Sequence, residues 1–283
     1  MRVSIVNACL RDGAGGSPTA VLEASQAEFE LREVPRLAGT SHAVVVSVTG
    51  GGVDWPHVSL RFFTAAGELP ACGHGTVAAL AFLAENGRRH VYRVIVQASG
   101  RSFAGEVTRE DDRVAASFDP GPVQIREATG EERALVLDAV GYDPGALLAE
   151  ACVASLGRWP RLLVPVPTPK TLTRLQPDYG RLRDGCDRLG LLGCYLYSVP
   201  TTEGRLSARM FAPSIGVPED IANANSTACL AAKLAQRTAT RITADMGDSL
   251  GRPSTVTAIV RQTRSGTHVR VGGTARVMHT RRL

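Results

Sequence analysis

Two stretches of sequence decide the fold: RFFTAAGELPACGHGT at Arg61–Thr76 and RMFAPSIGVPEDIANANST at Arg209–Thr227. Each begins with a short β-rich run, passes through a loop with glycine and proline, and ends in small polar residues before an Ala-rich segment. The Ala-rich segments, Thr76–Asn86 and Ser226–Arg237, are apolar around most of the helix circumference, which predicts two buried helices. We therefore expect one structural plan that occurs twice in the chain.

β-rich runs bounded by turn-forming residues fill much of the remaining sequence. They include Val3–Ala8, Ala43–Val48, Val58–Phe63, Leu162–Val166, Cys194–Val199 and Thr255–Arg261. Sheets around two buried helices predict an α+β fold with two halves. The turn cluster DPGP at Asp119–Pro122 places the boundary, giving an N-terminal half at residues 1–118 and a C-terminal half at residues 119–283. The last strand of the second half can return to the first half.

The charge pattern argues against a nucleic-acid partner. The 283 residues include 32 Lys and Arg against 27 Asp and Glu, a formal net charge of +5, but the positive charges are scattered. Aromatic residues make up 5% of the chain, too few for a basic surface on which bases stack. Neither lysine, Lys170 or Lys233, has a context that suggests a Schiff base. We expect a small anionic molecule as the ligand.

The cysteines and the apolar runs indicate a reduced, cytoplasmic protein. The six cysteines have neither CxxC nor zinc-finger spacing. The N-terminal apolar run is too short for a secretory signal, and no stretch is long enough to predict a membrane span. Phosphate-loop, dinucleotide-binding, HExxH and GxSxG motifs are missing from the sequence. We therefore expect no membrane, no metal and no cofactor, and a reaction carried by proton transfer between side chains.

The residues before the first predicted helix are Cys72, Gly73, His74 and Gly75. A helix N-terminus favours an anion, and a histidine there can exchange a proton near neutral pH. A cysteine at such a position can act as a base. Capping and packing are the structural alternatives. The clustering favours a functional role for His74 and leaves Cys72 open.

At the start of the second predicted helix lie Glu219, Asp220, Asn223, Asn225, Ser226 and Thr227. Glu219 or Asp220 is a candidate general acid or base, and the asparagines and the serine can hydrogen-bond a carboxylate. Helix capping explains the same residue types equally well, above all for Asn225, Ser226 and the following threonine. His42, just before the apolar run AVVVSV, is ambiguous on its chemistry alone.

Four motifs carry a resemblance to a known family. They are VNACLRDGAGGSPTAVL at Val6–Leu22, ELPACGHGTVAAL at Glu68–Leu80, ARMFAPSIGVPED at Ala208–Asp220 and VGGTARV at Val271–Val277. In this order they resemble the PhzF-type (phenazine-biosynthesis-like) isomerases, a branch of the diaminopimelate epimerase fold. Ser17 stands where the family usually has asparagine. The resemblance covers essentially the whole chain.

The resemblance implies two pseudo-symmetric halves, each a curved β-sheet around a central helix, with the active site in the cleft between them. The family is cofactor-independent, usually dimeric, and moves a proton along an allylic system. His74 and Asp220 match the motif histidine and aspartate, whereas His42 stands where the family has its catalytic glutamate. We expect these three residues to be catalytic. The expected substrate-binding residues are Ser17, Cys72, Gly73, Gly75, Asn223, Ala224, Asn225 and Ser226, with Ala224–Asn225 replacing the family's anion-binding Gly-Ser pair.

These observations predict an isomerase of a small unsaturated carboxylic acid that catalyses a 1,3-type proton shift. The chain resembles the PhzF-like isomerases of alkylproline (4-propylproline-type) pathways in antibiotic biosynthesis, where the substrate is an unsaturated pyrroline carboxylate. One alternative is a racemase or epimerase that uses Cys72, because proline racemases share the Cys-Gly-His-Gly step. Another is a carboxylate-binding homologue without catalytic activity. We expect a homodimer in each case.

Overall fold

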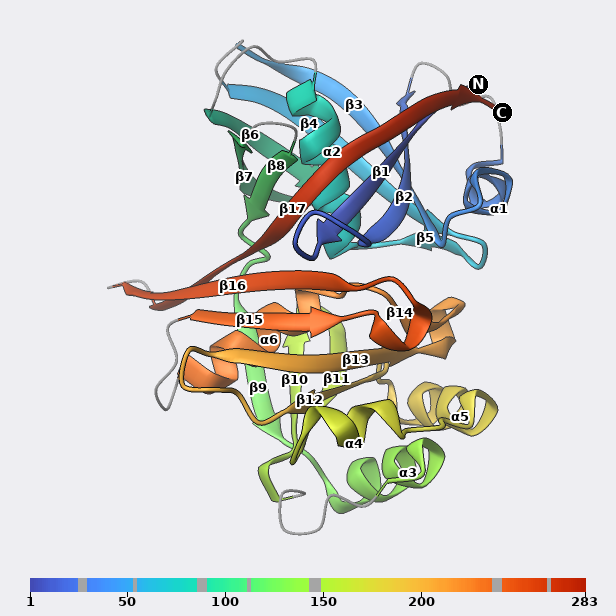
Figure 1. Cartoon of the computed structure of the whole chain (residues 1–283), viewed down its shortest axis with the longest axis vertical. Coiled ribbons are helices and arrows are strands. Elements are labelled where there is room, and N and C mark those ends of the chain that lie inside the picture. The colour runs from blue at the N-terminus through green and yellow to red at the C-terminus, as the bar shows by residue number, and fades with distance from the viewer. Residues whose placement is uncertain are drawn as a thin grey trace. The chain divides into compact units, whose positions relative to one another are not determined.

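The computed structural model describes residues 1–24, 30–52, 55–85, 91–110, 113–142, 149–235, 241–263 and 266–283 (Figure 1). Its contacts divide the chain into two compact units. Unit 1 comprises Met1–Pro120, Arg252–Thr255 and Arg270–Leu283, and unit 2 comprises Gly121–Gly251 and Val256–Val269. His90 and the ends of both predicted buried helices, from residues 86 and 236 onward, lie outside the described residues.

The strands of unit 1 form a sheet that closes on itself. They are β1 (Arg2–Leu10), β2 (Ser17–Glu23), β3 (His42–Gly52), β4 (Trp55–Thr64), β5 (Gly67–Leu69), β6 (Val91–Ala98), β7 (Arg101–Glu110), β8 (Arg113–Phe118) and β17 (Gly266–Arg282). β1 pairs antiparallel with β2, β2 parallel with β3, β3 antiparallel with β4, and β4 parallel with β6. β6, β7 and β8 continue antiparallel, and β17 pairs with both β8 and β1, which closes the ring.

Helix α2 (Gly73–Glu85) runs through this ring and contacts β1, β2, β3, β4, β7 and β8 (Figure 1). Many of its side chains are small, and at the larger Leu80 the strand β7 makes room with Gly105. A Cβ at Gly105 would lie 2.7 Å from Leu80 Cδ2 of the helix. The short α1 (Val34–Ala38), after the 3₁₀ turn Leu31–Glu33, packs on the outer face of β2 and β3. The predicted buried helix therefore fills the inside of the sheet.

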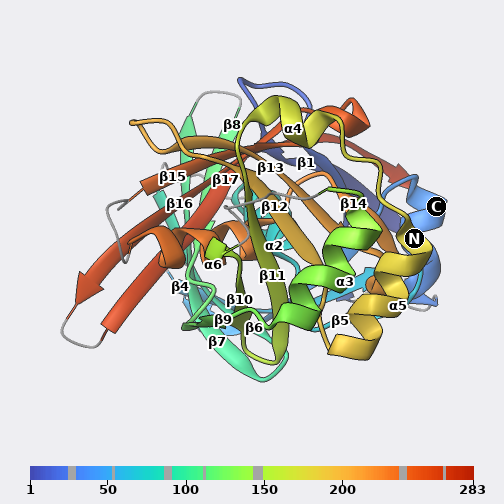
Figure 2. The same cartoon turned by 90° about the horizontal axis from the view of Figure 1, so that it is seen from below.

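Unit 2 repeats this plan around helix α6 (Ala224–Ala235). Its strands are β9 (Val123–Glu127), β10 (Cys152–Leu156), β11 (Trp159–Val166), β12 (Cys194–Ser198), β13 (Arg205–Ala212), β14 (Val217–Asp220), β15 (Arg241–Met246) and most of β16 (Ser254–Thr263). Short 3₁₀ turns lie at Pro213–Ile215 and Asp248–Leu250. α6 contacts β9, β10, β11 and β15. On the other face of the sheet lie α3 (Gly130–Val140), α4 (Pro169–Thr173) and α5 (Tyr179–Leu189), with α3 beside α5 (Figure 2).

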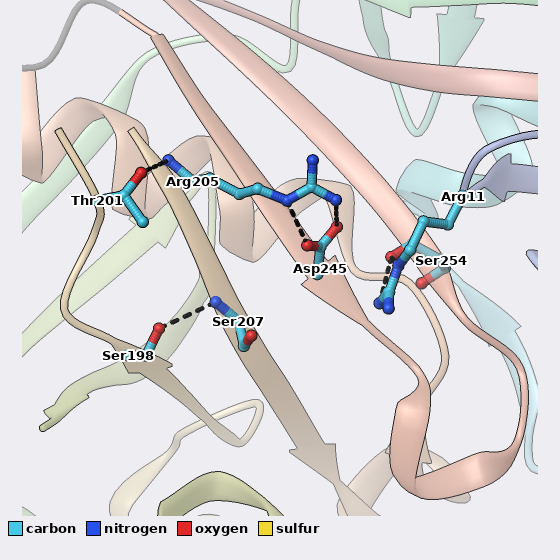
Figure 3. Close-up of polar contacts among 7 residues, drawn as sticks. All are labelled: Arg11, Ser198, Thr201, Arg205, Ser207, Asp245 and Ser254. Carbon is cyan, nitrogen blue, oxygen red and sulfur yellow. Dashed lines mark hydrogen bonds and ion pairs between the residues drawn. The ribbon is translucent and has the colours of Figure 1, made fainter. Parts of the chain in front are cut away.

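The order of pairings in unit 2 matches that in unit 1. β10 pairs antiparallel with β11, β11 parallel with β12, β12 antiparallel with β13, and β13 parallel with β15. Arg205 of β13 and Asp245 of β15 hold the last pairing at its surface, with the guanidinium 2.7 and 3.1 Å from the carboxylate oxygens (Figure 3). The predicted α+β fold, built as two halves on one plan, is confirmed.

The strand register relates individual positions of the two halves. On the outer faces, Ala43 pairs with Phe63 in unit 1, and Cys194 pairs with Phe211 in unit 2. One residue back along β3 is His42, which faces inward and pairs with Thr19. One residue back in unit 2 is Gly193, whose carbonyl accepts a hydrogen bond from Leu162, and the neighbouring inward residue is Arg161. Gly193 is therefore the counterpart of His42, and Arg161 is the counterpart of Thr19.

Two further sequence expectations concern the membrane and the cysteines. Among the described residues, no helix combines the length and the hydrophobicity that crossing a bilayer requires. All six cysteines are buried and none forms a disulfide.

Candidate active site

The first helix start is built around Cys72, which caps α2 with its thiol. Gly75 donates its backbone N–H to Cys72 Sγ at 3.4 Å. Thr76 donates its backbone N–H and its hydroxyl to the Cys72 carbonyl at 2.9 and 2.8 Å. A Cβ at Gly75 would lie 2.9 Å from Cys72 Sγ, so this position has to be glycine for the cap to fit. The helix starts at Gly73, earlier than predicted, which puts Gly73, His74 and Gly75 in its first turn rather than before it.

Three groups able to carry protons meet at this helix start; we call His42, Cys72 and His74 the imidazole–thiol cluster. The rings of His42 and His74 meet edge to face, with centroids 4.4 Å apart and planes at 84°. Cys72 Sγ lies 3.4 Å from His74 Nε2. All three residues are buried, with 3%, 6% and 1% of their surface exposed for His42, Cys72 and His74. The fold thus brings together two histidines from a strand and a helix far apart in sequence.

Burial lowers the pKa of His42 well below its usual 6.5, and the neighbouring His74 lowers this pKa further. Both causes oppose a positive charge on the ring. His42 is therefore a neutral imidazole near pH 7, with a lone pair able to accept a proton. His42 Nδ1 lies 2.9 Å from Ser41 Oγ. When Nδ1 carries the hydrogen of that bond, Nε2 is the basic nitrogen.

Ser17 lies on the same side of the sheet as His42. Thr19 pairs with His42, and Ser17, two residues away along β2, points to the same face. Ser17 is fully buried, and its hydroxyl has no hydrogen-bond partner among the described residues. A buried hydroxyl without a partner is uncommon and indicates a place where a ligand or water completes the bonding.

The imidazole–thiol cluster could also hold a metal ion. Its ligand atoms all lie within 4.8 Å of one another, and in the described part of the chain no other group of three or more such residues does so. Two imidazoles and one thiolate suit zinc, with a fourth position left for water or a ligand. The same atoms are the ones able to carry protons, so metal binding and proton transfer exclude each other here.

The second helix start carries the same type of cap with an amide in place of the thiol. Ser226 donates its backbone N–H to Asn223 Oδ1 at 2.8 Å. Thr227 donates its N–H and its hydroxyl to the Asn223 carbonyl at 3.1 and 2.9 Å. Asn223 is thus the counterpart of Cys72. The expectation that Asn225, Ser226 and Thr227 cap the helix is wrong, because α6 begins at Ala224 and these residues already belong to its first turn.

Asp220 is buried, with 6% of its surface exposed, and accepts a hydrogen bond from Asn223 Nδ2 at 2.9 Å. Of the two acids considered as acid or base, Glu219 is engaged elsewhere. Arg209 binds both of its carboxylate oxygens, at 2.8 and 2.7 Å, and Ser249 donates to the same group. Arg209 also donates to two backbone carbonyls. Glu219 therefore belongs to a buried structural ion pair, and Asp220 remains the acid at the helix start.

The predicted site residues thus form two groups, each described within its own unit. Unit 1 brings together Ser17, His42, Cys72, Gly73, His74 and Gly75. Unit 2 brings together Asp220, Asn223, Ala224, Asn225 and Ser226, of which Ala224 is buried and Asn225 half-buried.

Sequence reasoning missed Arg161, which is 2% exposed and lies 3.4 Å from Ser226 Oγ through its Nη1. The signal that could have found it is a lone arginine inside the apolar run of β11.

Comparison with known proteins agrees with this description. The family model "Phenazine biosynthesis-like protein" (PhzC-PhzF) matches residues 7–281. An uncharacterized isomerase of Clostridium acetobutylicum is 26% identical over 262 residues, covering 87% of this chain and 85% of the relative. A trans-2,3-dihydro-3-hydroxyanthranilate isomerase of Pseudomonas fluorescens is 27% identical over 211 residues, covering 73% and 69%.

The fold is also that of a solved PhzF-family protein from Bacillus anthracis. The TM-score is 0.82 at 16% sequence identity, with 100% of this chain and 98% of that chain covered. Because the family model spans nearly the whole sequence and the curated relatives are named isomerases, the chain belongs to the phenazine biosynthesis-like (PhzC-PhzF) family and is a PhzF-like isomerase.

Proposed function

We propose that this isomerase shifts a proton along the allylic system of a small unsaturated carboxylic acid, with His42 as the base. The single observation that carries the proposal is the packing of a neutral, buried His42 edge to face against His74 at 4.4 Å. A desolvated neutral imidazole accepts a proton from carbon without first losing one.

The step balances without a co-reactant. His42 Nε2 removes a proton from one end of the allylic system, and the C–H electron pair moves into the adjacent double bond. The double bond shifts by one position, and the resulting imidazolium returns the proton to the other end. His74 orients the ring of His42 and takes part in the relay. The resemblance assigns substrate positioning to Asp220 and carboxylate binding to the residues at the start of α6.

His42 stands where the family has glutamate, which favours a substrate of different charge or acidity. We propose an unsaturated pyrroline carboxylate of a 4-alkylproline-type antibiotic pathway as this substrate. We further propose that the enzyme needs no cofactor, works in the cytoplasm and forms a homodimer. Light scattering coupled to size-exclusion chromatography tests the dimer directly.

Exchange of hydrogen with deuterated water tests the reaction. The enzyme is incubated with trans-2,3-dihydro-3-hydroxyanthranilate or with an unsaturated pyrroline carboxylate, and the label is located by NMR. We expect deuterium at the allylic carbons and a loss of exchange in His42→Ala of about 10²–10⁴-fold. His57→Ala, which changes an exposed histidine of β4, is the matched control. Full exchange in His42→Ala contradicts the assignment of the base.

One observation favours a second candidate, an epimerase that uses Cys72. The thiol of Cys72 lies beside His74 Nε2, with which it can exchange a proton, and accepts a helix N–H. Its counterpart Asn223 has no basic group, so a mechanism with one base on each helix start is disfavoured. This candidate predicts label at the α-carbon and loss of activity in Cys72→Ser. Carboxylate binding without any exchange identifies a homologue that has lost the chemistry.

A further inference from the structure

Unit 2 contains a buried cation to which the described residues offer no carboxylate partner. Arg161 of β11 is 2% exposed, and its guanidinium donates to the Trp159 carbonyl at 2.8 Å and to Ser226 Oγ at 3.4 Å. Its Nε is buried and has no hydrogen-bond partner among the described residues. Neither of its partners carries a charge. Removing a guanidinium from water without an opposite charge lowers the stability of the fold, so a buried arginine of this kind calls for a reason other than stability.

A second buried arginine in the same unit shows how the fold satisfies such a charge. Arg209 of β13 makes two hydrogen bonds to the Glu219 carboxylate and two to backbone carbonyls. Its charge is compensated within the protein. The contrast leaves Arg161 as a buried cation for which the described residues supply no anion.

The strand register relates Arg161 to a position beside the candidate base of unit 1. It is the counterpart of Thr19, the strand neighbour of His42 in unit 1. The counterpart of His42 is Gly193, where a Cβ would lie 2.0 Å from the Phe211 carbonyl oxygen, so no side chain fits there. In unit 1 the imidazole of His42 on β3 lies at the start of α2. In unit 2 the guanidinium of Arg161, on the neighbouring strand β11, lies at the start of α6.

The start of α6, beside Arg161, supplies further hydrogen-bond donors. Ser226 stands in the first turn of α6, and its hydroxyl donates to Met210 Sδ at 3.5 Å, a weak acceptor that an anion can replace. The N–H groups of Ala224 and Asn225 have no partner inside the helix, because they belong to its first turn. A helix N-terminus, a hydroxyl and a guanidinium together favour a negatively charged ligand.

We propose that Arg161 and Ser226 form the subsite at the start of α6 that binds the carboxylate of the substrate. This inference rests on the proposed function and names the residue that gives the enzyme its preference for an acid. The guanidinium supplies the charge, and the Ser226 hydroxyl, turned away from Met210, supplies a hydrogen bond.

The test compares two ligands that differ by one carboxylate. 3-Hydroxyanthranilate is the aromatic analogue of the compound named for the Pseudomonas relatives, and 2-aminophenol is the same molecule without its carboxylate. Their dissociation constants are measured by calorimetry at low salt for the wild type, Arg161→Met and Arg161→Lys. We expect the wild type to bind the acid more tightly. Arg161→Met loses about ten- to a hundredfold in affinity for the acid and leaves binding of 2-aminophenol unchanged.

Thermal unfolding of the ligand-free variants separates binding from a structural role. If Arg161 is kept for a ligand, Arg161→Met removes an uncompensated charge and keeps or raises the midpoint temperature. Arg209→Met, which leaves Glu219 buried and alone, is the matched control and lowers the midpoint by roughly 6–20 °C. An equal fall in both variants, with wild-type affinity for the acid in Arg161→Met, overturns the proposal.

Two further results are decisive. A wild type that does not prefer 3-hydroxyanthranilate over 2-aminophenol contradicts a carboxylate subsite. If Arg161→Met does not fold, the Arg161→Lys variant is used in its place. The ratio of its affinities for 3-hydroxyanthranilate and 2-aminophenol is compared with that of the wild type, and an unchanged ratio refutes a role of Arg161 in carboxylate binding. Both ligands bind without being converted, so the ratio does not depend on the base. A failure of the proposed proton shift therefore leaves this measurement intact and distinguishable.

Discussion

Replacing His42 by glutamine tests the electrostatic account of the site. The unfolded chain binds a proton at this histidine near pH 6.5, whereas the folded protein resists protonation because burial and His74 lower the pKa of His42. As the pH falls through 6.5, the unfolded state therefore gains a proton first. The contribution of His42 to stability is fully present above pH 6.5 and is lost as the pH falls toward the folded-state pKa. Glutamine does not titrate, so the variant lacks this loss.

The magnitude follows from linkage. Below pH 6.5 the wild type loses about 1.4 kcal/mol of unfolding free energy for each pH unit relative to His42→Gln. Between about pH 7.5 and pH 5.5 the difference amounts to about 1.4 kcal/mol. The groups that face His42 are His74 and Cys72, and both remain in the variant. Proton exchange into the substrate falls by about 10²–10⁴-fold in the same variant.

Urea unfolding followed by circular dichroism at a series of pH values gives the two stability curves. His57→Gln, at an exposed histidine, serves as the control and follows the wild type. Parallel curves for the wild type and His42→Gln would refute the view that His42 is held neutral by burial. The rate profile provides an independent check, since kcat/KM stays level as the pH falls through 6.5 and declines only at lower pH.

Three further predictions concern the caps, the register and metals. Asn223→Ala removes the cap of α6 and the hydrogen bond to Asp220, which lowers the free energy of unfolding by about 2 kcal/mol. The midpoint temperature in calorimetry falls by about 4–8 °C, whereas Asn225→Ala changes it little. Gly193→Ala forces a Cβ against the Phe211 carbonyl and lowers the free energy of unfolding by about 1–3 kcal/mol. Gly130→Ala, which has open space around it, is the control and stays unaffected. Equal denaturation midpoints for the two variants contradict the register argument. Enzyme dialysed against EDTA keeps full exchange activity, and added Zn²⁺ inhibits it by occupying the imidazole–thiol cluster; a need for added metal contradicts proton transfer by His42.

Local patterns predicted much of the fold. The Ala-rich composition of two segments predicted the buried helices, because small apolar side chains let strands pack on most sides of a helix. The shared loop before each helix predicted the repeat. Helix starts were placed too late, since the caps are a thiol at Cys72 and an amide at Asn223, and either residue type can also sit in a loop.

The sequence by itself determined the class of fold and pointed to His74, Cys72 and Asp220 as candidates, because these follow from patterns among near neighbours in the chain. Only the tertiary structure decided that His42 packs against His74 and that Glu219 forms an ion pair with Arg209. It also decided that Arg161 is buried with an Nε that has no hydrogen-bond partner among the described residues. Each of these depends on strands that pair across long separations. Burial then sets the charge: the same imidazole that titrates near neutrality in water is held neutral when the sheet closes over it.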